Sequence, residues 1–504
     1  MERRHRDDPD AVIAELAHHQ HEALAVGDPE RAYDCARRAA ERATRLLAHE
    51  QAALHWGQAV AALEHCESVD PQRRLDALLA LGEAHRLAGD RPRRRAAFGA
   101  AIGFCDLSEW SPIDPEAREA TEAALAELPP EATAERVRLL TRVAYLAARG
   151  ETEKAVPVAR QAVEEARAAG DPSALQDALY TLLFLLAGPD HLGERDRLAR
   201  EAETVARASG TTDPTVIALL DLACDRIAEC DPEGARHWRK AAGEVAGHDP
   251  HLGRVWHLRV HDAGIALLEG RFEDAERDIE ELARVGQRIE HPYARGVERA
   301  LRAFLARDRG DDEEVLRIFD PTRPIRIGPV QFVQAVVGRA LAACGRPAEA
   351  AAVSEDLMAG GVEGIPRNIR WAATVAETAL LAAELGDQAR ARALLPLIEP
   401  FAARYAVLPL ATYSGPFARC LARLEETLGR LDRADARWEE AAEIATLLGA
   451  RPMQARVQVE HGRCLARRGE RRRARERLGE GARLAEALAM TRLAREAHEA
   501  LAEA

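Results

Sequence analysis

Two histidines four residues apart form the arrangement in this sequence that is most typical of metal chemistry. His257 and His261 lie in a predicted helix, where this spacing places both imidazoles on one face. His248 and His251 precede the pair, and Asp262 follows it. A zinc site needs further ligands, but no Cys or Glu stands at a predictable spacing. The apolar neighbours favour an ordinary helix face, so we predict neither a metal site nor a cofactor.

Arginines of the C-terminal half have the chemistry to recognise anions. A guanidinium binds a carboxylate or a phosphate through two parallel hydrogen bonds, which a lysine cannot do. Whether several arginines act together depends on the register of the helices that carry them. If the register of the helices turns these arginines away from a shared face, they are ordinary solvated side chains of an arginine-rich chain. The residues concerned are Arg339, Arg419, Arg423, Arg456, Arg463 and Arg467.

An uncharged stretch, Ala406–Pro416, is the third feature that could carry function. A connection this apolar is expected to pack on or into something instead of lying in water. Aromatic residues make up only 4% of the chain, yet Trp371, Tyr405 and Tyr413 lie in or near this stretch. They either line a ligand pocket or fill the joint between packed helices, and both interpretations stay open at this point.

Patterns of common catalytic sites do not occur. There is no Gly-x-x-x-x-Gly-Lys-Ser/Thr, and neither Lys154 nor Lys240 lies in a glycine-rich loop. There is no Gly-x-Ser-x-Gly nucleophile turn either. We therefore expect a binding protein more than an enzyme.

Composition and charge restrict the class of protein further. The net charge of −14 over 504 residues disfavours direct binding to nucleic acid or to an anionic membrane. No apolar run has the length of a membrane span, and no signal-type segment is evident. The eight cysteines are scattered without a Cys-x-x-Cys pair, which is typical of a reducing compartment. These observations predict a cytoplasmic protein.

Helices must position all of these residues, because the chain is rich in Ala, Leu, Arg and Glu and poor in strand formers. A glycine followed five positions later by alanine marks the turn and the start of a second helix. From Gly270 onward the turn glycines are 35 to 43 residues apart, a period typical of stacked helix pairs. We predict an all-α superhelical solenoid of antiparallel helix pairs. The turns are Gly27/Ala32, Gly150/Ala155, Gly270/Ala275, Gly345/Ala350, Gly386/Ala391, Gly429/Ala434 and Gly469/Ala474.

Interruptions of this rhythm by proline predict the domain organisation. At Cys230 the turn is kept although cysteine replaces glycine, and at Gly310 the usual alanine is Val315. The predicted parts are a disordered N-terminus at 1–10, N-terminal repeats at 11–105, an irregular joint at 106–135, middle repeats at 136–319 and C-terminal repeats at 320–504.

The turns resemble tetratricopeptide repeats of the MalT-like variety. Gly82, Gly338 and Gly462 stand at the small position of the first helix, and Phe272 matches the aromatic after the turn. The chain also resembles the sensor region of large ATP-binding LuxR-type actinobacterial regulators, without their ATPase and DNA-binding modules. The stretches that carry this resemblance are 15–19, 27–32, 39–43, 268–272 and 447–452.

The resemblance implies that the first helix of each pair lines a concave groove. The ligand-binding candidates are then Arg339, Arg419, Arg423, Arg463, Trp371, Tyr405 and Tyr413. It implies a regulatory or scaffolding protein that binds a peptide, a protein or a small acidic ligand in the groove. One alternative is an enzyme or metabolite-binding protein with its site near 406–416, and another is a stand-alone sensor that acts with a separate partner. Stacked repeats also have open terminal faces, which allow homo-oligomers to form.

Overall fold

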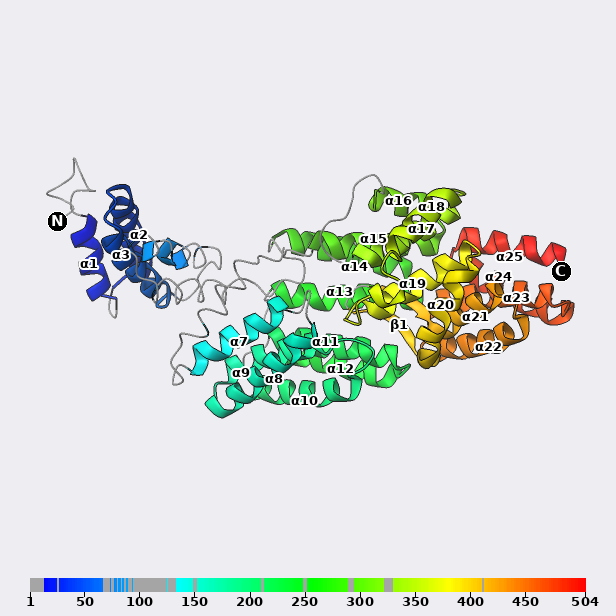
Figure 1. Ribbon diagram of the computed structural model, residues 1–504, viewed down its shortest axis with the longest axis horizontal. Coiled ribbons are helices and arrows are strands. Elements are labelled where there is room, and N and C mark those ends of the chain that lie inside the picture. The colour runs from blue at the N-terminus through cyan, green and yellow to red at the C-terminus, as the bar shows by residue number, and fades with distance from the viewer. Residues whose placement is uncertain are drawn as a thin grey trace. The chain divides into compact units, whose positions relative to one another are not determined.

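In the part of the chain that the computed structural model describes, the regular structure is all helical apart from one small hairpin (Figure 1). The described residues are 13–24, 27–66, 133–147, 152–209, 213–247, 252–288, 294–320, 330–409 and 412–504, with isolated positions between 73 and 125. The predicted joint at 106–135 lies almost entirely outside this range, as do residues 321–329. None of the described helices combines the length and the apolar character needed to cross a membrane.

The chain divides into two compact units, and the division falls between Leu182 and Leu183. In the first unit, Asp28 caps a helix by accepting hydrogen bonds from the backbone N–H groups of Glu30 and Arg31 at 3.0 and 3.3 Å. Pro29 occupies the first turn of this helix. The backbone N–H that proline lacks would have no partner within the helix at that position, so its absence costs nothing. The helices are α1 (Ile13–Glu22), α2 (Pro29–Arg45), α3 (His49–Leu63), α7 (Thr133–Ala147), α8 (Thr152–Ala169) and α9 (Pro172–Leu185), which crosses the division.

The second unit, to Ala504, contains every candidate ligand-binding residue. Its first helices are α10 (Leu192–Ser209), α11 (Asp213–Ala228), α12 (Pro232–Ala246), α13 (Leu252–Glu269), α14 (Phe272–Arg288), α15 (Ala294–Arg309) and α16 (Asp312–Ile318). Next come α17 (Val330–Ala343), α18 (Pro347–Leu357), η2 (Val362–Gly364), α19 (Trp371–Glu384), α20 (Gln388–Ile398) and η3 (Glu399–Phe401). The last elements are β1 (Tyr405–Leu408), β2 (Thr412–Pro416), α21 (Phe417–Thr427), α22 (Leu431–Leu447), α23 (Arg451–Arg467), α24 (Arg471–Ala487) and α25 (Thr491–Glu503). The prediction of an all-α arrangement of antiparallel helix pairs is confirmed.

Most of the predicted turn glycines adopt the left-handed conformation that favours glycine, whereas Gly27 does not, and Gly150 lies outside the described residues. Gly270, Gly429 and Gly469 have φ angles of 78°, 75° and 81°, a region in which a side chain is strained. Cys230 occupies the same position with a φ of 61°, so the turn is retained there without glycine. The alanine five positions after each glycine is buried, as at Ala275, because the second helix packs closely against the first.

A close helix contact explains the glycine at the small position of α23. A Cβ added to Gly462 would lie 2.6 Å from Cγ of Leu478 on α24 and 3.1 Å from the Leu478 backbone nitrogen. At Gly338 of α17, the corresponding atom would lie 2.7 Å from Cδ2 of Leu381 on α19. Glycine therefore fixes the separation of packed helices in this unit.

The uncharged stretch folds as a β-hairpin, which the sequence did not predict. β1 and β2 pair antiparallel, with Ala406 opposite Gly415 and a bulge between Ala406 and Val407. β1 packs against α11 and α19, and β2 against α13, α15, α19, α21 and α22. The hairpin therefore lies among helices from distant parts of the second unit, as expected for an uncharged segment that must leave water.

Helices that lie far apart in the sequence also pack on one another in the second unit. One hydrophobic cluster runs from Trp256 on α13 to Leu493 on α25. Gly270 lies so close to α24 that an added Cβ would be 2.8 Å from Cδ2 of Leu488. Gly310 is packed in the same way against Arg492 of α25, whose guanidinium pairs with Asp312. The boundary predicted at 319/320 thus lies within one packed unit.

Candidate binding groove and its surroundings

Three of the predicted arginines line one open cavity at the C-terminal end of the second unit. Arg423 comes from α21, and Arg463 and Arg467 from α23. Glu460 of α23 and Glu499 and Glu503 of α25 also line the cavity, whose volume is about 590 Å³. α21, α23 and α25 are alternate helices, which is the arrangement expected when the first helix of each pair lines a groove. We call this cavity the arginine groove.

Each arginine of the groove is held by a glutamate. Arg423 and Arg467 both bind the Glu426 carboxylate, the former at 3.2 Å, and Trp438 donates its ring N–H to the other oxygen at 2.7 Å. Arg463 binds the carboxylate of Glu496 at 3.3 Å and its backbone oxygen at 3.1 Å. The side chains of Arg463 and Arg467 remain 41% and 50% exposed, so a ligand can reach both guanidiniums.

The other predicted arginines are buried instead of lining the open groove. Arg419 is 3% exposed and forms two 2.8 Å hydrogen bonds with the Glu460 carboxylate. Arg456 is bonded to Asp308 at 3.0 Å. Arg339 lies deep between α17 and α19, where it binds two glutamates. The structure therefore separates the sequence-predicted set into exposed and buried arginines.

Glu377 is the centre of the buried charges. It is fully buried and accepts hydrogen bonds from Arg307 at 3.0 Å and from Arg339 at 2.6 Å. Arg339 also binds Glu384 at 2.8 and 3.0 Å. Burial alone would raise the pKa of Glu377, but the two guanidiniums outweigh it and lower the pKa to about 2. Likewise, Arg419 overcomes burial and lowers the pKa of Glu460 to about 2.

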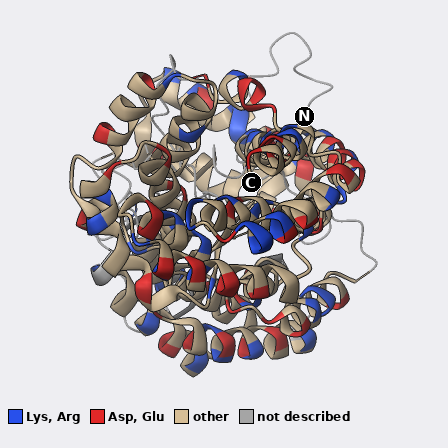
Figure 2. Cartoon of the chain, turned by 90° about the vertical axis from the view of Figure 1, so that its right-hand side faces the viewer, with Lys and Arg blue, Asp and Glu red and all other residues tan. Residues whose placement is uncertain are grey.

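Three of these ion pairs join residues that lie one repeat apart along the chain. Arg419 and Glu460 are 41 residues apart, Arg467 and Glu426 also 41, and Arg339 and Glu377 38. Each pair thus connects the first helices of successive repeats. The sequence therefore contains a signal for these ion pairs, namely an Arg and a Glu separated by one repeat period. The prediction from the sequence named the arginines but not their glutamate partners. Figure 2 shows basic and acidic positions interspersed along the helices that face the viewer.

Two of the three predicted aromatic residues, Tyr405 and Tyr413, belong to the hairpin, and Trp371 begins α19, which packs against it. Trp371 and Tyr405 are 1% and 2% exposed, and burial raises the pKa of the Tyr405 hydroxyl. Tyr405, Tyr413 and Thr412 border a cavity of about 20 Å³, which has room for one water molecule. The hydroxyls of Thr412 and Ser414 are buried without a hydrogen-bond partner among the described residues.

One histidine of the predicted pair, His261, lies beside an ion pair. His261 is buried, with Nδ1 3.8 Å from a carboxylate oxygen of Asp262, and burial lowers the pKa of this histidine. Asp262 is held by Arg239 through two hydrogen bonds of 2.8 and 2.7 Å. His248 and His251 lie outside the described residues.

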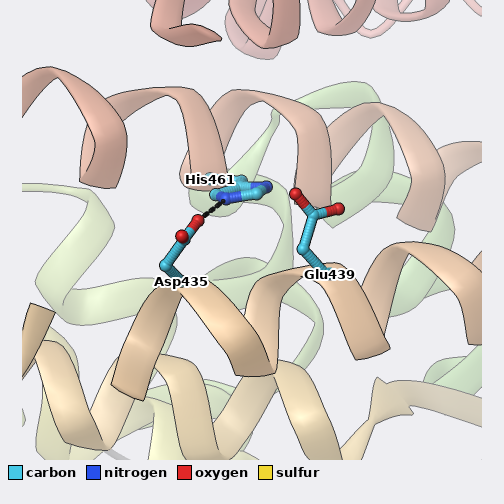
Figure 3. A group of neighbouring side chains, drawn as sticks. All are labelled: Asp435, Glu439 and His461. Carbon is cyan, nitrogen blue, oxygen red and sulfur yellow. Dashed lines mark hydrogen bonds and ion pairs between the residues drawn. The ribbon is translucent and has the colours of Figure 1, made fainter. Parts of the chain in front are cut away.

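A different group, Asp435, Glu439 and His461, has ligand atoms within 4.8 Å of one another (Figure 3). His461 Nε2 lies 2.7 Å from the Asp435 carboxylate. The two carboxylates also bind arginines, namely Arg468, Arg473 and Arg477. A cation placed between the carboxylates would face these guanidiniums at close range, so the group fits an ion-pair network better than a metal site.

Comparison with known proteins was made for the whole chain. No family model matches the sequence, and no curated protein matches it. Among solved structures, the chain is similar to the APC/C hetero-tetramer Cut9–Hcn1 at 11% sequence identity. The TM-score is 0.32, and the alignment covers 92% of this chain and 96% of that chain. The description of this fold as helical repeats therefore rests on the protein's own helix pairs.

Proposed function

We propose that this helical-repeat protein binds a peptide segment bearing acidic residues in the arginine groove. The observation that carries the proposal is that Arg423, Arg463 and Arg467 border the same open cavity. A guanidinium has five N–H donors, and the bond from Arg467 to Glu426 uses one of them. The remaining donors can bind a ligand carboxylate, and guanidinium–carboxylate bonds are among the stronger hydrogen bonds in proteins.

The carboxylates of the groove favour a ligand of mixed charge. Glu499 and Glu503 line the groove from α25, and Glu460 lines it from α23, the helix that carries Arg463 and Arg467. An extended peptide presents successive side chains on opposite sides. A segment that alternates acidic and basic residues would therefore offer partners to the arginines and to the glutamates of the groove. Ala466 and Ala500, which also line the groove, are small enough to let a peptide backbone approach closely.

We infer a regulatory or scaffolding role, because the groove is proposed to recognise a segment of another protein. The resemblance to sensor regions of LuxR-type regulators supports the same role. In that role the bound segment would belong to a separate protein partner.

The test is fluorescence anisotropy with a short labelled peptide of alternating Glu and Lys. We expect saturable binding that weakens as salt is added. The double substitution Arg463→Ala and Arg467→Ala should weaken binding about tenfold or more, since each lost charged hydrogen bond contributes about 1 kcal/mol or more.

The matched control is Arg472→Ala with Arg483→Ala, which removes two arginines from the exposed face of α24. It should leave the affinity unchanged. A block peptide, with all Glu before all Lys, has the same composition and should bind more weakly. If the groove and control variants bound the alternating peptide equally, the groove would not be its site.

A further inference from the structure

Another cavity of the second unit lies where segments that are distant in the sequence meet. Its walls come from residues 187–195, from the end of α11, from the start of α19 and from the chain between η3 and α21. The cavity volume is about 50 Å³, and one side is open to solvent. A water molecule needs about 10–15 Å³ of such space, so the cavity has room for a ligand of roughly four non-hydrogen atoms. We call it the small cavity.

Two arginines line the small cavity. Arg195 is 1% exposed and donates hydrogen bonds from Nε to the Leu183 carbonyl at 3.1 Å and from Nη1 to the Asp225 carboxylate. Arg404 is half-buried and donates from Nη1 to the Pro189 carbonyl at 3.0 Å. Nη2 of each guanidinium has no hydrogen-bond partner among the described residues. Both arginines therefore have a donor left for a ligand in the cavity.

The charges around the small cavity leave one positive charge uncompensated. Asp225 is the acidic residue of the described lining, and it is bound to Arg195. Asp190 interacts with Arg404 but is held by Arg367 through hydrogen bonds of 3.0 and 2.6 Å. These three arginines and two carboxylates carry a net charge of about one, which a single monovalent anion would balance.

Most of the remaining lining is apolar. Ala187, Leu192, Ala228, Ala372 and Val407 all contribute to it. A methyl group that leaves water for such a surface gains about 0.8 kcal/mol. The cavity thus offers guanidinium donors to an anionic group and apolar surface to a short alkyl group.

We propose that the small cavity binds a short aliphatic carboxylate of the size of acetate. The carboxylate accepts hydrogen bonds from Arg195 and Arg404, and the methyl group lies against the apolar lining. The anion is preferred over a neutral molecule of the same shape, because it compensates the charge of Arg404 and because charge-assisted hydrogen bonds are stronger than neutral ones. A branched acid exceeds the volume of the cavity.

The experiment is saturation-transfer NMR on the full chain with acetate as the probe. Acetamide has the same shape without the charge, and pivalate has the carboxylate with a branched group. We expect acetate to bind saturably and both comparisons to bind at least tenfold more weakly. Arg404→Gln should weaken acetate binding at least tenfold. The matched control, Arg392→Gln at an exposed position of α20, should leave acetate binding unchanged.

Ala228→Leu fills part of the cavity without removing a charge and should also weaken acetate binding, so it repeats the test if Arg404→Gln does not fold. Its control is Ala348→Leu, at an exposed position of α18. Acetate binding that is absent, or equal in the cavity and control variants, would overturn the proposal. Acetamide or pivalate binding as tight as that of acetate would also overturn it.

A blocked aspartate, whose side chain ends in the same group as acetate, distinguishes a free acid from a peptide side chain. We expect it to bind at least tenfold more weakly than acetate, because its backbone does not fit the cavity. Equal binding would overturn the assignment to a free acid. Peptide binding in the arginine groove uses other residues, so either proposal can fail without the other.

Discussion

At the scale of the residue, the same amino acid has different roles at different depths. Arg463 and Arg467 are about half exposed and can meet a ligand, whereas Arg419 is buried and donates hydrogen bonds from Nε and Nη2 to the two carboxylate oxygens of Glu460. Exposed ion pairs contribute little to stability because water screens them. A buried arginine that loses its partner leaves an uncompensated charge, which is costly.

Glu377→Gln tests the buried charge centre. The neutral amide leaves Arg307 and Arg339 without their shared carboxylate, so we expect the free energy of unfolding to fall by about 3 kcal/mol. Urea denaturation followed by circular dichroism measures the change. The control is Glu349→Gln, which removes an exposed carboxylate that binds Arg346 and should leave the denaturation midpoint unchanged. Equal midpoints for both variants would contradict the role given to Glu377.

At the scale of the element, small residues decide how closely helices pack. The turn glycines and the alanines after them were read from the sequence, and their conformations follow from steric limits alone. The hairpin could not be predicted in this way, because its strands are short and its burial depends on helices far away in the sequence. Strand formation there is a consequence of tertiary packing.

Two glycine substitutions on neighbouring helices should have opposite effects. Gly462→Ala places a methyl group against Leu478, including its backbone, and should lower the free energy of unfolding by about 1 to 3 kcal/mol. Gly479→Ala meets nothing within 4 Å and should raise it by up to about 1 kcal/mol, since alanine favours the helix. Thermal denaturation of both variants distinguishes the effects. Stabilisation by Gly462→Ala would show that α23 and α24 are not held at this separation.

At the scale of the whole second unit, ion pairs connect successive repeats, and hydrophobic packing joins α13 to α25. Glu377 and Glu460 have pKa values of about 2 in the folded protein, below the ordinary value of 4.5. A carboxyl group whose pKa is lowered by folding stabilises the fold above its ordinary pKa. This contribution is lost as the pH falls toward the folded-state value.

Acid should therefore destabilise the second unit progressively between about pH 5 and pH 2. Urea denaturation of the full chain at pH 7, 5 and 3 should show a midpoint that is similar at pH 7 and 5 and lower at pH 3. The Glu377→Gln variant should lose part of this dependence because it lacks one of the titrating groups. A midpoint that is the same at pH 7 and pH 3 would show that the two carboxylates do not contribute as described.

Local sequence determined the helix pairs, their turns and the positions where glycine or alanine is required, because sterics and helix propensity act over a few residues. It also placed Arg423, Arg463 and Arg467 on first helices. Only the tertiary structure decided that these three line an open groove while Arg339 and Arg419 are buried. The physical reason is that exposure depends on the curvature of the stacked repeats and on carboxylates from the next repeat, such as Glu460, and neither is encoded within one helix.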